Sequence, residues 1–207
     1  MSEAVNESRR NFLRLALAIP VGAAAGAALY PANEALGSEI TEHTGIQTGN
    51  ASNEAALHAA CDTAPSYNAC AADQMDKMGT KASVGGPIIE EMCYRAVPSL
   101  MSDMVDMALH DDVAYTAPPK NVAVGTGTIG MTRNELITGA LTTAVFGFGH
   151  NVSANGDVDT RTLPVQSLIG GGVLWVLQRK LGFAANLTAH SVYNFRWLHG
   201  FRSGRSH

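Results

Sequence analysis

Apolar residues along this chain gather into stretches of helical length, separated by short polar or glycine-rich segments. The first stretch runs from Leu15 to Tyr30. Beyond residue 80 the periodicity predicts four more helices, over residues 87–109, 132–151, 163–180 and 183–198. Their starts carry local signals, because Pro87 follows two glycines and Thr132 stands three positions before Glu135, the spacing of a capping box. The pattern therefore predicts an all-α chain.

The predicted helices are unusually rich in glycine, as at Gly147, Gly149 and residues 170–172. Each glycine within a helix costs about 1 kcal/mol relative to alanine, but in a membrane small residues let helix backbones approach closely. Several of the stretches are shorter than the roughly 18 apolar residues typical of a membrane span. We nevertheless predict a polytopic membrane helix bundle of about four to five helices, with membrane lipid as a partner.

The N-terminal 30 residues are predicted to be an anchor or an export signal. The sequence SRRNFLR at residues 8–14, followed by the first apolar stretch, resembles a twin-arginine signal. The alternative is a first membrane helix with its arginines on the cytoplasmic side. Either way, we expect an integral protein of a bacterial or archaeal plasma membrane, with the following segment across or beyond that membrane.

Residues 31–80 form a polar, acidic N-terminal segment that we place on the non-cytoplasmic side. The segment holds seven Asp or Glu residues and a single basic residue, Lys77. Within it, Cys61 and Cys70 either form a disulfide, as an exported segment allows, or remain reduced, and Cys93 is unpaired in both cases. The histidines and cysteines here lack a zinc-binding spacing. Residues 201–207 are a polar tail.

Composition and charge exclude some classes of function. Of the 207 residues, 46% are hydrophobic and only 15% are charged, against roughly 25% in a typical soluble domain. The net charge of -4, without a basic cluster, excludes nucleic acid as a partner. Gly125, Gly127 and Gly130 have GxGxxG spacing, but no acidic ribose partner follows about 20 residues later, so we interpret them as a flexible loop.

Polar residues recur at helical spacing within the apolar stretches. Glu90 and Glu91 precede Arg95, and Glu91 and Arg95 are one turn apart on one face. Two further pairs have the same spacing: Phe146 with His150, and His190 with Asn194. Ionisable groups in a membrane helix usually face a partner or a water-filled cavity, so we predict one shared polar cavity. Structural alternatives are an ion pair, a helix cap and an interhelical hydrogen bond.

In their order, EExxxR (residues 90–95), FxxxH (146–150) and HxxxN (190–194) resemble the CAAX prenyl protease and bacteriocin-processing family of intramembrane endopeptidases. The resemblance covers about residues 80–200 and identifies residues 81–200 as the expected protease domain. Two features depart from the family's pattern. Ala96 replaces the glycine that commonly follows the motif arginine, and the insertion at 102–131 is long.

The resemblance implies an all-α membrane bundle whose three motifs meet at a cavity open to water. Glu90 and His150 would activate a water molecule, while His190 and Asn194 would hold the oxyanion formed on a peptide or protein substrate. Arg95 would keep Glu91 charged. A histidine and a side-chain amide are suitable donors to developing negative charge, and a carboxylate is a common general base.

Two alternatives stay open at this point. Glu90, His150 and His190 could instead form a zinc site, but zinc rarely binds amides such as Asn194, and the resemblance implies a glutamate protease without metal or other cofactor. The second alternative is a non-catalytic membrane protein of the same fold, for example a bacteriocin-immunity or scaffold protein, whose cavity only binds.

Overall fold

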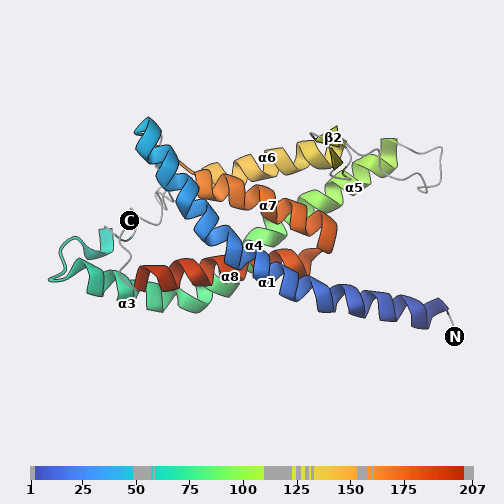
Figure 1. Cartoon of the computed structure of the whole chain (residues 1–207), viewed down its shortest axis with the longest axis horizontal. Coiled ribbons are helices and arrows are strands. Elements are labelled where there is room, and N and C mark those ends of the chain that lie inside the picture. Colours follow the sequence, from blue (N-terminus) through green and yellow to red (C-terminus); the bar gives the residue numbers. More distant parts are fainter. Residues whose placement is uncertain are drawn as a thin grey trace.

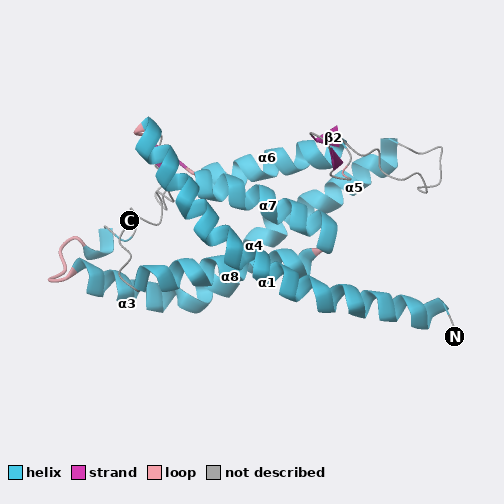
Figure 2. Cartoon of the chain, in the orientation of Figure 1, coloured by secondary structure: helices cyan, strands magenta, loops and turns pink. Residues whose placement is uncertain are grey.

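The computed structural model describes residues 3–48, 57, 59–109, 123–124, 127–128, 131, 133–152, 158–159 and 161–202 (Figure 1). Helices dominate the described residues, so the predicted all-α class is confirmed (Figure 2). The long helices are α1 (Glu3–Thr44), α3 (Tyr67–Thr80), α5 (Val97–Leu109), α6 (Arg133–Gly149), α7 (Val165–Leu181) and α8 (Phe183–Arg202). Between α3 and α5 lie the π-helical turn η1 (Lys81–Gly85), the short helix α4 (Gly86–Glu91) and a second π-helical turn, η2 (Met92–Ala96).

The described strands are only two residues long. Strand β1 (Gln47–Thr48) pairs in parallel with β4 (Thr162–Leu163), with Gln47 opposite Thr162. Strand β2 (Ala123–Val124) pairs antiparallel with β3 (Gly127–Thr128), within the segment that we interpreted as a loop. The rest of that glycine pattern, including Gly125 and Gly130, lies outside the described residues.

Helix α1 extends well beyond the predicted apolar stretch. It continues through Pro31 to Thr44, so the change in composition after Tyr30 is not the end of a helix. Proline lacks the N–H that would bond to the carbonyl four residues earlier, and for Pro31 this is the carbonyl of Ala27. Nη1 of Arg196 in α8 donates to that oxygen at 2.8 Å. The helix tolerates Pro31 because α8 supplies the missing donor. In Figure 1, α1 also changes direction about midway along its length.

The second pass of the chain is one continuous helical run from Tyr67 to Leu109. We expected a helix to begin at Pro87 after a break at Gly85 and Gly86; α4 does begin at Gly86 with Pro87 in its first turn, but the expected break is absent because the helical turn η1 leads directly into it. The π-helical turn η1 immediately precedes α4, and its wider spacing accommodates the proline. The second wide turn, η2, closes where the N–H of Val97 bonds to the carbonyl of Met92.

The last three helices closely follow the predicted ranges. Gly182 alone separates α7 from α8, with a φ of 87° that favours glycine, and its N–H donates to Gln178 O at 3.0 Å. Thr132 lies outside the described residues, so the predicted capping box is not described. The carboxylate of Glu135 pairs with Arg179 of α7.

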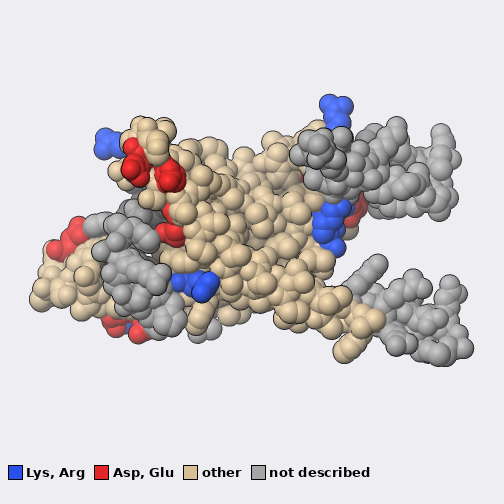
Figure 3. All heavy atoms as spheres, viewed as in Figure 1, with Lys and Arg blue, Asp and Glu red and all other residues tan. Residues whose placement is uncertain are grey.

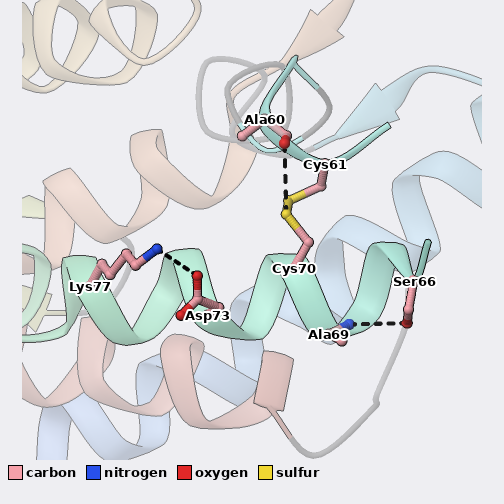
Figure 4. Close-up of a disulfide and its surroundings, with 7 residues drawn as sticks. All are labelled: Ala60, Cys61, Ser66, Ala69, Cys70, Asp73 and Lys77. Carbon is pink, nitrogen blue, oxygen red and sulfur yellow. Dashed lines mark hydrogen bonds and ion pairs between the residues drawn. A yellow bond between two sulfur atoms is a disulfide. The ribbon is translucent and has the colours of Figure 1, made fainter. Parts of the chain in front are cut away.

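Cys61 and Cys70 form a disulfide, which decides between the two alternatives that the sequence left open (Figure 4). Cys93 is exposed and free. Cys61 is buried with Leu57, Ala71 and Leu198, so the disulfide segment packs on the C-terminal part of α8. At the start of α3, the Oγ of Ser66 caps the helix by accepting from the N–H of Ala69.

The bundle has two ends, which we name by their residues. At the disulfide end lie the end of α1, the β1–β4 pair, the Cys61–Cys70 bond and the end of α8, on the left in Figure 1. At the Arg179 end, the guanidinium of Arg179 pairs with Asp103 of α5, 2.8 Å away, and with Glu135 at the start of α6. The described chain therefore passes between the ends five times, through α1, the run from α3 to α5, α6, α7 and α8.

Helices α1 and α8 run in parallel and touch through small residues. A Cβ on Gly22 would collide with the carbonyl of Ala185, and one on Gly26 with the carbonyl of Ala189. Further along, the rings of Tyr30 and Tyr193 meet edge to face at 5.8 Å. The glycines of α1 therefore fix how closely α8 can approach.

Replacing Gly26 by valine should destabilise the fold. The new side chain would strike backbone of α8, and overpacking costs about 1–3 kcal/mol. We expect the melting temperature of the purified protein to fall by roughly 2–12 °C. Ala24→Val adds bulk to an exposed position of the same helix and is the matched control. Equal melting of the two variants would contradict the close α1–α8 contact.

Candidate functional site

The centre of the bundle holds a fully buried ion pair. Glu91 ends α4 and Arg95 lies in η2; neither is exposed, and Nε of Arg95 is 3.6 Å from Oε2 of Glu91. The contact expected from their spacing is therefore present. The guanidinium lies over the Phe146 ring, with Cζ 4.1 Å from its centroid, in a cation–π arrangement. Gly171 of α7 leaves room for it, since a Cβ there would be 3.0 Å from Nη2 of Arg95.

Two side chains of α8 complete the environment of Glu91. Nδ1 of His190 lies 2.6 Å from its Oε1, and the amide of Asn186 donates to its Oε2. Asn186 is fully buried and was not predicted. Its signal in the sequence was its position four residues before His190, which places both side chains on one face of a helix.

His190 also contacts the neighbouring carboxylate. Its Nε2 is 3.5 Å from Oε2 of Glu90, whose side chain is 32% exposed. Adjacent helical residues point about 100° apart, so the two carboxylates leave the backbone in different directions. Both reach His190 because the imidazole lies between them and presents one nitrogen to each. The side chain of Glu91 is fully buried, whereas that of Glu90 is partly exposed.

The protons of His190 follow from its partners. A carboxylate oxygen only accepts, so Nδ1 carries a proton toward Glu91. On the opposite side Nε2 faces Glu90, and that contact is attractive when a proton lies between the two groups. An imidazolium at His190 with Arg95 balances Glu90 and Glu91, which leaves a cluster without net charge.

His150 lies on another side of Phe146. Its Nδ1 is 2.7 Å from the carbonyl oxygen of Phe146, so Nδ1 donates and a neutral ring presents a free electron pair at Nε2. The rings of Phe146 and His150 are 4.6 Å apart, and those of Phe146 and His190 are 5.9 Å apart. Among the described residues no direct hydrogen bond or ion pair joins His150 to Glu90, and the expected arrangement, in which both contact one water molecule, stays a prediction. Asn194 lies one turn beyond His190 on α8 and is half-buried.

The loop after His150 is held by its own polar contacts. The amide of Asn151 donates to the carbonyls of Asp159, at 3.0 Å, and Thr162, at 2.6 Å. The carboxylate of Asp159 accepts from the hydroxyl of Thr162 and the N–H of Arg161, and these hydrogen bonds hold the pKa of Asp159 below its usual value. Asn151 therefore joins the described residues on either side of this loop at the edge of the site.

A groove of about 370 Å³ lies between η1 and α8. Its lining comprises Ser83, Val84, Leu187, Thr188, Ser191, Val192 and Phe195. The hydroxyls of Ser83 and Thr188 are already bonded to the carbonyls of Gly79 and Ala184. The groove therefore suits an apolar chain, and it contains none of the charged residues of the cluster.

In the described part of the chain, no group of three or more His, Cys, Asp or Glu side chains is arranged to hold a metal ion. No protein-family model matches the sequence, and no curated protein or solved structure matches it either. The function must therefore be argued from the residues of the site.

Glu91→Gln should act through stability. The substitution leaves Arg95 and His190 without the charge that balances them, and breaking a buried pair costs about 3–5 kcal/mol. We expect the melting temperature to fall by roughly 6–20 °C. The matched control is Glu39→Gln, which removes an ion pair with His43 whose side chains are 68% and 70% exposed. A Glu91→Gln protein that melts like this control would contradict the structural role of Glu91.

Proposed function

We propose that this chain is an intramembrane endopeptidase of the CAAX prenyl protease-like type, which hydrolyses a peptide bond in or near the membrane. The observation that carries the proposal is His190 held between two adjacent carboxylates, one buried and one accessible. Such a set combines a fixed donor with a base that solvent can reach, as hydrolysis requires. Arg95 and Asn186 hold Glu91, and Glu91 holds His190.

The distribution of side chains supports a position in the membrane. Arg95, Glu91 and Asn186 are among the largest fully buried side chains, while apolar side chains of α4, η2, α5 and α6 are exposed. The exposed set includes Ile88, Ile89, Met92, Val97, Leu100, Met101, Met104, Ile137, Leu141, Val145 and Phe148. A soluble protein shows the reverse distribution, and exposed apolar area on this scale indicates contact with lipid or protein. The face shown in Figure 3 is largely uncharged in its upper middle, and most of its Asp and Glu atoms lie toward the disulfide end.

Helix length gives weaker support. One described helix, Leu15–Thr44, is apolar and long enough to cross a bilayer, with a mean hydropathy of 1.6, and a signal sequence or a core helix passes the same test. Helices α6 and α7 have 17 residues each and would span about 25 Å, a little less than the roughly 30 Å hydrocarbon core. The polytopic bundle therefore rests on the exposed apolar faces rather than on hydropathy.

In the proposed mechanism, Glu90 and His150 activate the water molecule. Glu90 is the accessible carboxylate. Nε2 of a neutral His150 ring carries a free electron pair, because Nδ1 holds the proton and donates it to the Phe146 carbonyl. In the proposed step, a water oriented by His150 transfers a proton to Glu90 and its oxygen attacks the peptide carbonyl carbon. Glu90 then returns the proton to the amine nitrogen as the C–N bond breaks, so the products are a carboxylic acid, which keeps the second water proton, and an amine.

Stabilisation of the oxyanion falls to His190 and Asn194. An imidazolium at His190 has an N–H at Nε2, on the side where Glu90 would hold the water, and Asn194 follows one turn later. Because Glu91 accepts the Nδ1–H, the ring is oriented before substrate arrives, which is how fixed donors lower the barrier.

A non-catalytic role is the second candidate. The observation that favours it is the closure of the cluster, because Glu91 already contacts His190, Asn186 and Arg95 and has no exposed surface. In that case the charges would only fix the helices, and the cavity would bind without cleaving. The two candidates differ in whether Glu90 has a chemical task.

Glu90→Gln should remove catalysis and keep the fold. The amide preserves shape but cannot take the proton, so cleavage of a synthetic peptide library in detergent, read by mass spectrometry, should slow by roughly 10²–10⁴-fold. Glu39→Gln is the matched surface control. A Glu90→Gln protein with native activity would remove Glu90 from the mechanism, and an inactive wild type would favour the binding role.

Wild-type cleavage should also survive strong chelation, whereas loss on chelation and recovery with zinc would indicate a metal enzyme.

The membrane position has its own test. With the apolar faces of α4, α5 and α6 in lipid, the full-length chain should stay in the membrane pellet during carbonate extraction and require detergent to remain dispersed. Recovery of a stable monomer in the aqueous fraction would overturn the membrane proposal.

A further inference from the structure

The groove between η1 and α8 is formed by the same two segments of chain as the contact of Glu90 with His190. Both η1 and α4 pack on α8, so they face neighbouring parts of one helix (Figure 1). Ser83 and Val84 of η1 form one wall of the groove, and side chains within residues 187–195 form the other. His190 lies in the middle of that second stretch. The groove therefore adjoins the polar cluster.

Along α8, the cluster and the groove use neighbouring rows of side chains. Residues four apart stack along a helix, so Asn186, His190 and Asn194 form one row. The row one position further along, about 100° round the helix, belongs to the groove. It comprises Leu187, Ser191 and Phe195. The polar row and the groove wall thus run side by side for about 12 Å.

Gly86 keeps the way between the groove and Glu90 free of a side chain. It directly follows η1 and stands one turn before Glu90. A Cβ at this position would lie 3.8 Å from Oε1 of Glu90, so the carboxylate reaches back toward the glycine. The other oxygen, Oε2, lies 3.5 Å from Nε2 of His190. Glu90 therefore spans from the start of α4 to α8, next to the groove.

The size and chemistry of the groove suit a short apolar peptide. The hydroxyls of Ser83 and Thr188 donate to carbonyls one turn earlier, so these polar groups of the lining are already satisfied. An extended chain rises about 3.3 Å per residue, so about three to four residues fit along a wall of about 12 Å. The volume of about 370 Å³ is at the lower end for ligand sites.

We propose that the groove binds an apolar stretch of about three to four residues of the substrate polypeptide, beside the peptide bond that is cleaved. This rests on the proposed function, because it takes Glu90 as the base that acts on that bond. A polypeptide is favoured over a lipid tail because an extended peptide brings a backbone amide to Glu90, whereas a hydrocarbon tail has no group on which the carboxylate can act.

Photo-crosslinking locates the bound peptide without requiring cleavage. The probe is a synthetic peptide with four consecutive apolar residues between polar ends, one of the four being a photoreactive benzoylphenylalanine. Full-length wild-type protein in detergent is irradiated with this peptide, and the crosslinked residues are mapped by mass spectrometry. We expect crosslinks at the residues that line the groove, and few with a second peptide in which serines replace the other three apolar residues.

Val84→Phe fills the groove from the η1 side, and Val176→Phe is the matched control. Both valines are 46% exposed, and Val176 lies on α7 and is not part of the lining. We expect Val84→Phe to lower the crosslinking yield, and kcat/KM for the apolar peptide, by about 10–200-fold. The loss of kcat/KM should come from a higher KM, because the groove binds and does not react. The control should match the wild type in both readouts.

Crosslinks outside the groove, or equal effects of Val84→Phe and Val176→Phe, would overturn the proposal. So would a photoreactive fatty acid that labels the groove and is not displaced by the peptide, since that would identify a lipid site. The crosslink map of the wild type decides alone if Val84→Phe does not fold. Crosslinks in the groove without any cleavage would refute the protease and leave the peptide site standing, whereas equal cleavage of the apolar and serine peptides would refute the groove alone.

Discussion

The structure depends on the burial of a guanidinium group. Arg95 has no exposed surface, and a buried cation destabilises the fold by several kcal/mol unless charge and geometry compensate. Part of this cost is compensated from four directions: Glu91 of α4 supplies the negative charge, Phe146 of α6 supplies a ring face, Gly171 of α7 supplies space, and α8 holds Glu91 through His190 and Asn186. The three guanidinium nitrogens make no hydrogen bond among the described residues. Each helix that meets at the centre is therefore positioned by one arginine.

Small residues make this arrangement possible. Gly139 and Gly147 let α6 receive Trp175 and Leu168 of α7, because a Cβ at either glycine would collide with those side chains. On the other side of the bundle, Gly22 and Gly26 seat α1 against the backbone of α8. A helix such as α8, held from both sides, can keep His190 between two carboxylates. The glycines that weaken the individual helices thus determine the geometry of the polar cluster.

The sequence predicts where the helices lie better than where one helix continues into the next. It also predicts contacts between residues of one helix better than contacts between residues of different helices. Periodicity located α6, α7 and α8, and i, i+4 spacing located the contact of Glu91 with Arg95. The sequence did not show that helices continue through residues 31 and 85–87, because Arg196 compensates Pro31 from another helix and a π-helical turn leads directly into the helix that begins at Gly86. Asn186 and the bridge from His190 to Glu90 depend on how α4 and α8 face each other, which no local pattern encodes. The disulfide needed the distance between two segments, which spacing alone does not give.

The choice of histidine at position 190 follows from the two carboxylates. Glu90 and Glu91 diverge from one backbone, and a group that contacts both must present donors on opposite sides of a rigid, compact ring. An imidazolium does so, whereas a lysine concentrates its charge at one flexible end and a neutral amide adds no charge. In the proposed mechanism with an imidazolium at His190, the cluster would be neutral at rest, and transfer of a proton to Glu90 would leave one positive charge beside the newly formed oxyanion. The same interaction that stabilises the buried cluster would then stabilise the intermediate. Structural and catalytic roles for the cluster therefore need the same residues, and they differ in whether the accessible carboxylate of Glu90 has a chemical task.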